Sequence, residues 1–173
     1  YYIGWNELNK DNVYFSEAVT YNLENGEIKK TKLTSEGNLK VKINEYWNKK
    51  TITMPNVKVG SVFEFKYKII SENISKLPDF EFQDYIPVNY AKFTSEIPVN
   101  YQYKTMLRGY LQVEHTSKDE NFSQSFNDKY NQTKFLNYLL RKQNYILKNV
   151  PKLEEEIFID NIENYRSKLE NEL

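Results

Sequence analysis

The sequence predicts an all-β fold: an antiparallel β-sandwich with Greek-key-like or meander connections and at most one or two short helices. Three observations predict it. The 173 residues include 15 Tyr and 10 Phe but only 5 Gly, and aromatic side chains suit a pleated, half-buried surface. Many short apolar runs are separated by turn signals, as in a sandwich. One of these runs, residues 62–70, alternates strictly.

The first part of the chain is predicted to form a hairpin. Residues 13–23 are rich in aromatic and β-branched side chains and lead to Asn25-Gly26. This pair is the strongest two-residue hairpin signal, because a type I′ turn needs positive φ at both central residues. Residues 28–33 are then the returning strand. Residues 34–48 fit either strand or helix, since part of the segment alternates like a strand and part could close a helical turn.

Residues 62–70 give the clearest strand. A short extended piece over residues 51–54 leads to Pro55, and Gly60 supplies a backbone conformation that other residues resist. We therefore expect Pro55 and Gly60 to form a turn that sets the register of the strand; close approach of a ligand to the glycine is the other interpretation. One face of the strand is apolar and the other is charged, as an antiparallel sheet allows. The apolar face holds Phe63, Phe65, Tyr67 and Ile69.

The second half of the chain is predicted to continue as strands. A loop over residues 71–80 contains Pro78, which favours an extended Leu77. Pro87 and Pro98 lie at strand boundaries, where a missing N–H is tolerated. The predicted strands are residues 80–86, 88–97, 101–107 and 110–115.

Four later segments are less regular. Residues 116–133 are polar and predict a mobile hairpin end, and residues 135–147 stay open between helix and strand. Pro151 precedes a predicted short helix or turn over residues 153–158. Residues 165–173 are alternating or weakly helical.

Composition excludes several functions. Lys+Arg and Asp+Glu both number 24, so the net charge is +0, which argues against nucleic-acid binding. No apolar window of about 18 residues exists to span a membrane. The length predicts one domain over residues 1–173. Because the chain begins without methionine and in strand-like sequence, we expect a piece of a longer multidomain protein with incomplete N-terminal strands.

Three carboxylates form the first candidate site. Asp79, Glu81 and Asp84 surround Gln83, and paired carboxylates can carry acid–base hydrolysis. In a regular strand Asp79 and Glu81 share one face, whereas Asp84 faces the other way. The structural interpretation is a strand with one wet face, with Asp79 capping the loop after Pro78. A hydrolase using these carboxylates is the alternative.

The tyrosines form the second candidate site. Exposed aromatic side chains bind peptides, sugars or protein partners, because a ring offers a large contact area at low entropic cost. Packing within the sandwich is the competing interpretation. The candidate ligand-binding residues are Tyr85, Tyr90, Tyr101 and Tyr103, with Tyr110 on a following strand.

The sequence predicts no catalytic residue, cofactor or metal site. The chain has no cysteine, which removes thiolate chemistry. His115 lies at a predicted strand end beside Glu114 and Thr116, without the set of acid and nucleophile that catalysis needs, so a surface histidine is expected. Glu154, Glu155 and Glu156 lack the spacing of a calcium loop and are expected to stabilise a helical turn.

Five segments appear in an order that resembles a known bacterial family. They are TYNLENGEIKKTKL, MPNVKVGSVFEFKYKI, LPDFEFQDYIPV, EIPVNYQYK and NVPKLEEEIFIDNIENY. This order resembles the domain of unknown function 3857, which typically lies upstream of a transglutaminase-like domain. The resemblance runs from about Val13 to the C-terminus. Lys152 stands where the family often has alanine, and Phe80 where it often has tryptophan.

The resemblance implies a non-catalytic accessory domain. It would belong to a periplasmic or secreted bacterial protein and would support, orient or regulate the downstream domain or mediate protein interaction. That neighbour would use a Cys-His-Asp triad, which this chain cannot supply. The resemblance also gives Pro55, Gly60, Pro78, Asp79, Gln83, Pro87 and Pro151 as structural motif residues. A peptide- or carbohydrate-binding module using the tyrosines remains the main alternative.

Overall fold

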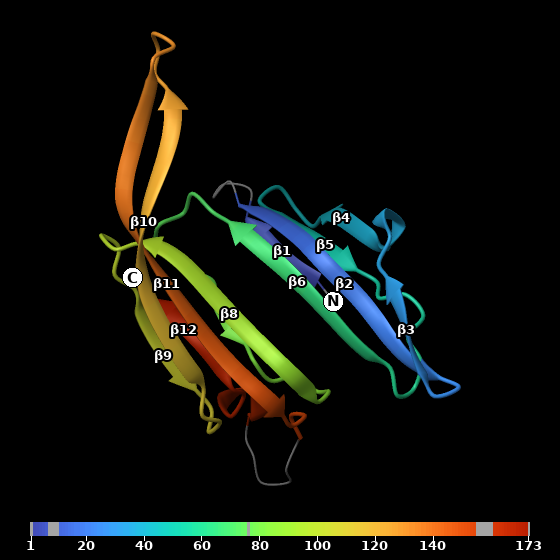
Figure 1. The fold of residues 1–173 in the computed structure, drawn as a ribbon. Coiled ribbons are helices and arrows are strands. Elements are labelled where there is room, and N and C mark those ends of the chain that lie inside the picture. The colour runs from blue at the N-terminus through green and yellow to red at the C-terminus, as the bar shows by residue number, and fades with distance from the viewer. Residues whose placement is uncertain (1, 7–10, 76, 155–160, 173) are drawn as a thin grey trace. The chain divides into compact units, whose positions relative to one another are not determined.

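The computed structural model describes residues 2–6, 11–75, 77–154 and 161–172 (Figure 1). The chain forms two compact units, unit 1 (Tyr1–Ile74) and unit 2 (Ser75–Leu173). Both consist of antiparallel sheets, which confirms the predicted all-β class. Within the described residues, helix is confined to the short 3-10 turns η2 (Ser35–Gly37) and η3 (Ile162–Asn164).

Unit 1 contains two three-stranded sheets, with the orders β1-β5-β4 and β3-β2-β6. Every pairing in them is antiparallel. Residues 34–48, which the sequence left open, contain η2, all of β4 and the start of β5. The strands are β1 (Tyr2–Asn6), β2 (Asn12–Glu24), β3 (Glu27–Lys32), β4 (Asn38–Lys42), β5 (Trp47–Ile52) and β6 (Val62–Ile70).

The local sequence signals of unit 1 act as predicted. Asn25 and Gly26 have φ angles of 53° and 84°, the two positive values that a type I′ turn needs. β6 alternates between half-buried and exposed side chains. Its half-buried face packs against β2, where the ring of Phe15 lies 6.4 Å from Phe65 and 6.0 Å from Tyr67, centroid to centroid.

The turn before β6 is tied to β2 by one buried side chain. Asn22 donates from Nδ2 to the carbonyl of Asn56 at 2.9 Å and accepts a hydrogen bond from the Ser61 hydroxyl. Gly60 has a φ of 85°, and a Cβ there would meet no atom within 4 Å. Backbone conformation, rather than lack of space, therefore requires glycine. This geometry is that of a turn that fixes where β6 begins.

Unit 2 is a two-layer sandwich of two three-stranded sheets, β10-β11-β8 and β7-β12-β9. Its core holds Phe82 and Leu169 from one layer against Tyr145, Leu147 and Val150 of β11. Each fully buried side chain of this size contributes about 1.5–3 kcal/mol. The strands are β7 (Phe80–Glu81), β8 (Val88–Pro98), β9 (Lys104–Arg108), β10 (Glu114–Asn127), β11 (Thr133–Val150) and β12 (Lys168–Glu172).

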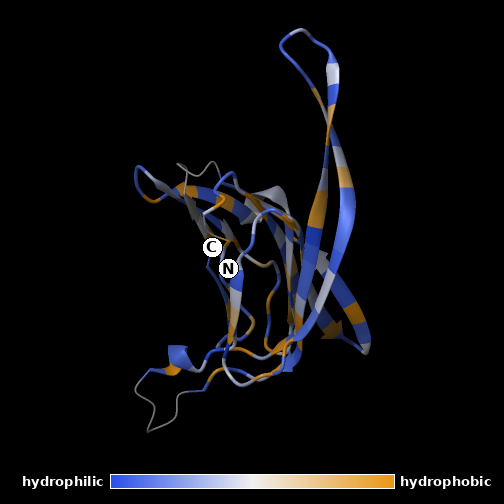
Figure 2. Cartoon of the chain, turned by 90° about the vertical axis from the view of Figure 1, so that its left-hand side faces the viewer, coloured by the Kyte–Doolittle hydropathy of each residue, from blue (hydrophilic) through white to orange (hydrophobic). Residues whose placement is uncertain are grey.

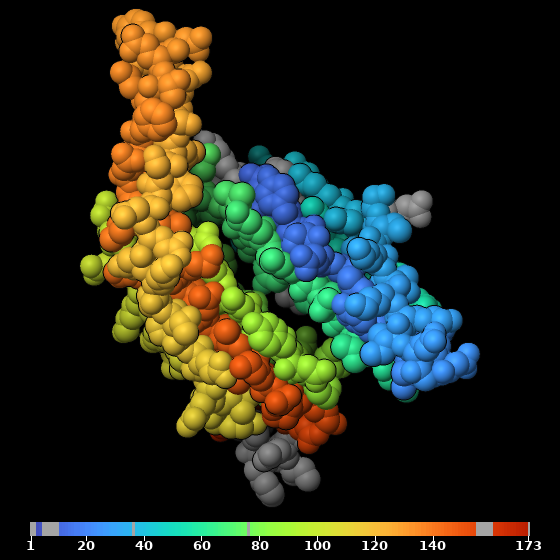
Figure 3. All heavy atoms as spheres, in the orientation of Figure 1, coloured from blue at the N-terminus to red at the C-terminus, as the bar shows by residue number. Residues whose placement is uncertain are grey.

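β10 and β11 form a long hairpin that extends beyond the rest of unit 2 (Figures 1 and 3). β8 pairs with β11 only as far as Leu140, so residues 121–139 form a two-stranded ribbon. Short apolar stretches lie between polar ones along it (Figure 2), and paired residues run through both strands to the turn. Residues 135–147 are therefore strand. The polar segment 116–133, predicted to be a hairpin end, is ordered strand up to Asn127, because each polar residue pairs across the ribbon with β11.

Three predicted strands have bounds that differ from those expected. Of residues 80–86 only Phe80–Glu81 forms β7. Beyond the bond from the Phe82 N–H to the Ser167 carbonyl, the Ser167 N–H donates to the Gln83 side chain, and the chain then turns at Asp84. The strands predicted from residues 101 and 110 begin instead at Lys104 and Glu114. The alternation over residues 165–173 does produce a strand, β12. The helix predicted over residues 153–158 lies largely outside the described residues.

Candidate functional site

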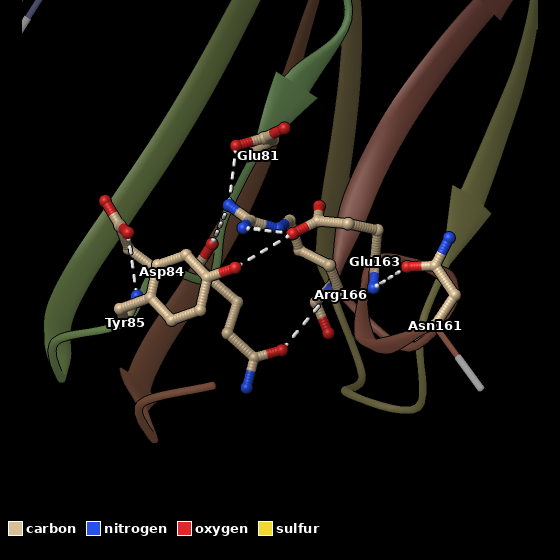
Figure 4. A network of polar contacts seen from close by, with 8 residues as sticks. Glu81, Asp84, Tyr85, Asn161, Glu163 and Arg166 are labelled. Atoms are coloured by element: carbon tan, nitrogen blue, oxygen red, sulfur yellow. Dashed lines mark hydrogen bonds and ion pairs between the residues drawn. The ribbon is translucent and has the colours of Figure 1, made fainter. Parts of the chain in front are cut away.

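Arg166 lies at the centre of a polar network in unit 2 (Figure 4). It follows η3, directly ahead of β12, and is only 6% exposed. Its Nη1 lies 2.7 Å from Oε2 of Glu81, and its Nη2 lies 2.8 Å from Oε1 of Glu163. Asn161 caps η3 by accepting from the Glu163 N–H, which holds Glu163 beside the guanidinium.

These contacts shift the protonation equilibria of both partners. Burial alone would lower the pKa of Arg166, but its hydrogen bond to Glu163 and the charge of Glu81 outweigh burial and raise it. The hydrogen bond from Arg166 lowers the pKa of Glu163 below 4.5. Because the folded-state pKa of Glu163 is depressed, its contribution to stability is present above pH 4.5 and is lost as the pH falls through the folded value.

Gln83 joins this network to the end of β11. The side chain is 1% exposed. It donates from Nε2 to the Pro151 carbonyl at 3.1 Å and accepts from the Ser167 N–H at 3.2 Å. Its own carbonyl accepts from Arg166 at 3.3 Å. One buried amide thus connects three segments that lie far apart in the sequence.

The candidate carboxylates are each occupied by a structural contact. Glu81 pairs with Arg166. Asp79 accepts a hydrogen bond from the N–H of Asn171 at 3.1 Å, next to the bond from the Asn171 side chain to the Pro78 carbonyl. Asp84 accepts from the Tyr85 N–H at 2.7 Å through its side chain and from the Leu153 N–H at 2.8 Å through its carbonyl. Each of the three residues thus caps or connects a segment of the chain.

Tyr85 covers the network on its outer side. Its hydroxyl donates to Oε1 of Glu163 at 3.2 Å, and the guanidinium carbon of Arg166 lies 5.3 Å from its ring centroid (Figure 4). The side chain is nevertheless 53% exposed. Tyr85 is therefore an exposed aromatic ring held in place from behind, the kind of side chain that loses little entropy on binding a ligand.

The other candidate tyrosines lie at several places in unit 2. Tyr90 and Tyr101 are also exposed, but Tyr90 lies near the start of β8 and Tyr101 lies beyond its end. At roughly 3.3 Å per residue, the part of β8 from Tyr90 to Pro98 is about 25 Å long. Tyr103 is half-buried, and burial raises its pKa. Tyr110 is exposed in the connection between β9 and β10.

The remaining predicted residues have structural positions. Pro87 directly precedes β8, and Pro151 directly follows β11. His115 is exposed and stacks on Tyr145, with ring centroids 4.4 Å apart. In the described part of the chain no three His, Cys, Asp or Glu residues gather as metal ligands; of the glutamate run, Glu155 and Glu156 lie outside that part.

The hairpin carries an open depression of about 380 Å³. It is lined by Asn121, Phe122, Ser123, Asn137, Tyr138 and Leu139. These residues belong to the two-stranded ribbon. The rings of Phe122 and Tyr138 pack across it at 5.2 Å, so the depression lies on a ribbon surface and lacks the enclosing walls of a typical ligand pocket.

Sequence reasoning missed Arg166, Glu163 and Ser167. A compositional signal for Arg166 was present, because the chain has only three arginines among its 24 basic residues. All three, Arg108, Arg141 and Arg166, pair with a carboxylate. Arginine presents a planar fork of donors that suits such pairs, whereas lysine is a point charge.

Comparison with known proteins defines the class of fold. No protein-family model matches the sequence, and no curated protein matches it. The fold is similar to that of a solved structure from Parabacteroides distasonis described as a candidate protease, with a TM-score of 0.66 and 14% sequence identity. The similarity covers 100% of this chain and 32% of that one. The chain therefore shares its all-β fold with about a third of a longer protein.

None of the described helices is long and apolar enough to cross a membrane.

Proposed function

We propose that residues 1–173 are a non-catalytic accessory domain of a longer, extracytoplasmic transglutaminase-like protein. The observation that carries the proposal is the contact between the family-like segments. LPDFEFQDYIPV, NVPKLEEE and the stretch that follows it meet through Gln83 and Arg166. Residues that could have formed a reactive site are used to hold unit 2 together.

The fold similarity supports the modular part of the proposal. The Parabacteroides protein is described as a candidate protease, and the matched region is 32% of its chain. In a transglutaminase-like enzyme the reaction needs a Cys-His-Asp triad, as the resemblance implies. This chain has no cysteine and one histidine, and that histidine stacks on Tyr145. The chemistry is therefore assigned to residues beyond these 173.

The proposal predicts that the domain supports the activity of the longer chain. Removing residues 1–173 while keeping the downstream domain should lower amine incorporation and peptide hydrolysis roughly tenfold or more, the size of ordinary coupling between sites. Circular dichroism of the remaining chain checks that it still folds. Full activity of a folded, shortened chain would contradict a supporting role.

A second candidate function is favoured by the exposed, fixed ring of Tyr85. A peptide or carbohydrate could stack on it, because an aromatic face gives large contact area at low entropic cost. Titrating short peptides and oligosaccharides to millimolar concentration should shift the NMR signals of Tyr85 and its neighbours. Tyr130, exposed in the hairpin turn, provides the control: Tyr85→Ala should abolish binding and Tyr130→Ala should not. No shift with any ligand would end this candidate.

A further inference from the structure

The outer half of β10 has the same sequence in both directions. Residues 121–127 are NFSQSFN, a palindrome centred on Gln124. The segment belongs to the ribbon that extends beyond the rest of unit 2 (Figures 1 and 3). Every residue in it is exposed, and it contains no charged residue, glycine or proline.

The backbone of the even-numbered residues of this segment faces β11. The Asp128 N–H donates to the Gln132 carbonyl at 2.9 Å, which continues the register of β10 and β11 by one pair. One pair of this kind fixes the direction of all the others, because hydrogen-bonded and non-hydrogen-bonded pairs alternate along an antiparallel ladder.

The odd-numbered residues therefore have their backbone groups at the outer edge. Leu139, the partner of Asn121 on β11, agrees with this assignment, since its carbonyl accepts from the Val99 N–H on the side away from β10. β10 is the end strand in the order β10-β11-β8, so no described strand pairs with its outer side. The N–H and C=O groups of Ser123 and Ser125 are thus available to another strand.

This edge lacks the devices that prevent strand addition. Exposed edges are ordinarily protected by lysine, proline or a β-bulge. β8, the opposite edge of the same sheet, carries Lys92 and ends at Pro98, and edge strand β3 carries three lysines in EIKKTK. Residues 121–127 carry none of these groups, and their register with β11 is unbroken. The segment is therefore open to pairing with a further strand.

The palindrome makes a second copy of the segment a fitting partner. In a two-fold symmetric pair each residue contacts its counterpart's partner in both directions. Antiparallel pairing centred on Gln124 places Phe122 of one copy opposite Phe126 of the other. Serine then lies opposite serine, and asparagine opposite asparagine. Just beyond the segment Glu120 would meet Asp128, and like charges directly opposite are unfavourable, so the pairing ends with the palindrome.

The phenylalanines lie where this pairing brings side chains closest. Even-numbered residues form the non-hydrogen-bonded pairs of the new ladder, whose side chains approach more closely than those of the hydrogen-bonded pairs. Phe122 and Phe126 are 43% and 51% exposed, and Phe122 already packs on Tyr138 at 5.2 Å. Aromatic pairs across strands stabilise a sheet, whereas a lone two-stranded ribbon is marginally stable.

We propose that two copies of the chain associate by antiparallel pairing of residues 121–127, which joins their ribbons into one four-stranded sheet. The open backbone groups of Ser123 and Ser125 supply the central hydrogen bonds. Because so short an interface belongs to the weak, transient class, we expect a dissociation constant of about 0.1–1 mM. This association is independent of the accessory role proposed above.

The test is sedimentation equilibrium of the whole chain at concentrations up to about 2 mM, well into the expected range. Gln124 lies on the two-fold axis, so a charge placed there meets itself. Gln124→Lys and Gln124→Glu should each weaken self-association roughly tenfold or more through like-charge repulsion. An equimolar mixture of the two variants should restore it, because lysine then faces glutamate. Gln102→Lys makes the same charge change at an exposed residue ahead of β9 and should have no effect.

Thermal unfolding of each variant checks that unit 2 remains folded. A chain that stays monomeric throughout would overturn the proposal, as would equal weakening by Gln124→Lys and Gln102→Lys. A mixture of the two Gln124 variants that stays monomeric would overturn the two-fold pairing. Species that grow beyond the dimer would indicate head-to-tail addition and would also overturn it. Since these readouts measure assembly, they are separate from the activity test of the accessory role.

Discussion

At the scale of single residues, Arg166 and Gln83 account for the way unit 2 is connected. Sequence reasoning identified Gln83 as a structural residue from the resemblance, but not its partners. Pro151 lies 68 residues away and Ser167 84 residues away, and no local pattern predicts contacts at such separations. Asn25 and Gly26 are the opposite case, because a type I′ turn is specified by the two residues that form it.

Replacing Arg166 by methionine tests the network. Methionine keeps much of the volume but removes the charged hydrogen bonds to Glu81, Glu163 and the Gln83 carbonyl. We expect the free energy of unfolding of unit 2 to fall by about 1.5–3 kcal/mol, measured by urea denaturation.

Arg108 supplies the matched control for this variant. It also pairs with a glutamate, Glu170, at 2.9 Å, but its side chain is 53% exposed. Surface pairs contribute about 0–1 kcal/mol, so Arg108→Met should have a small effect. Equal losses of unfolding free energy in both variants would show that the buried network stabilises unit 2 no more than an exposed ion pair does.

At the scale of elements, the sequence predicts strands whose residue pattern is local. It misses strands that are defined only by their pairing with another strand. β6 alternates strictly and was predicted with the correct bounds. β10 has few apolar residues and every residue is exposed, so only its register with β11 reveals a strand. β7 ends after two residues because the Gln83 side chain takes the Ser167 N–H and the Asp84 carbonyl accepts from Leu153 instead of from β12.

The outer hairpin provides the prediction at this scale. Replacing residues 121–139 by Asn-Gly would join Glu120 to Leu140, a directly opposed pair, through a favourable two-residue turn. Because an isolated two-stranded ribbon is marginally stable, we expect unit 2 to lose less than about 1 kcal/mol in urea denaturation. Leu147→Ala in the core should cost about 2–5 kcal/mol. Unfolding of unit 2 on shortening would mean that the ribbon is essential to it.

At the scale of the whole molecule, the order of the sequence segments is the basis of the resemblance, and no family model matches the sequence. Each segment alone describes a turn or strand, and the stretch from Met54 to Ile70 contains no reactive group. The structure places LPDFEFQ and NVP in contact within unit 2 and MPNVKVGS against β2 in unit 1. The division into two units falls at Ile74, inside a predicted loop whose composition does not distinguish a domain boundary from any other turn.

The central claim is that residues 1–173 contain no catalytic site, and turnover by the isolated chain tests it most directly. Peptide hydrolysis and amine incorporation should be measured for the chain and for Glu81→Gln and Asp79→Asn, with thermal unfolding as the check on folding. We predict rates equal to buffer for all three proteins. Turnover by the unmodified chain that disappears in a folded Glu81→Gln variant would contradict the claim and assign the carboxylates a chemical role.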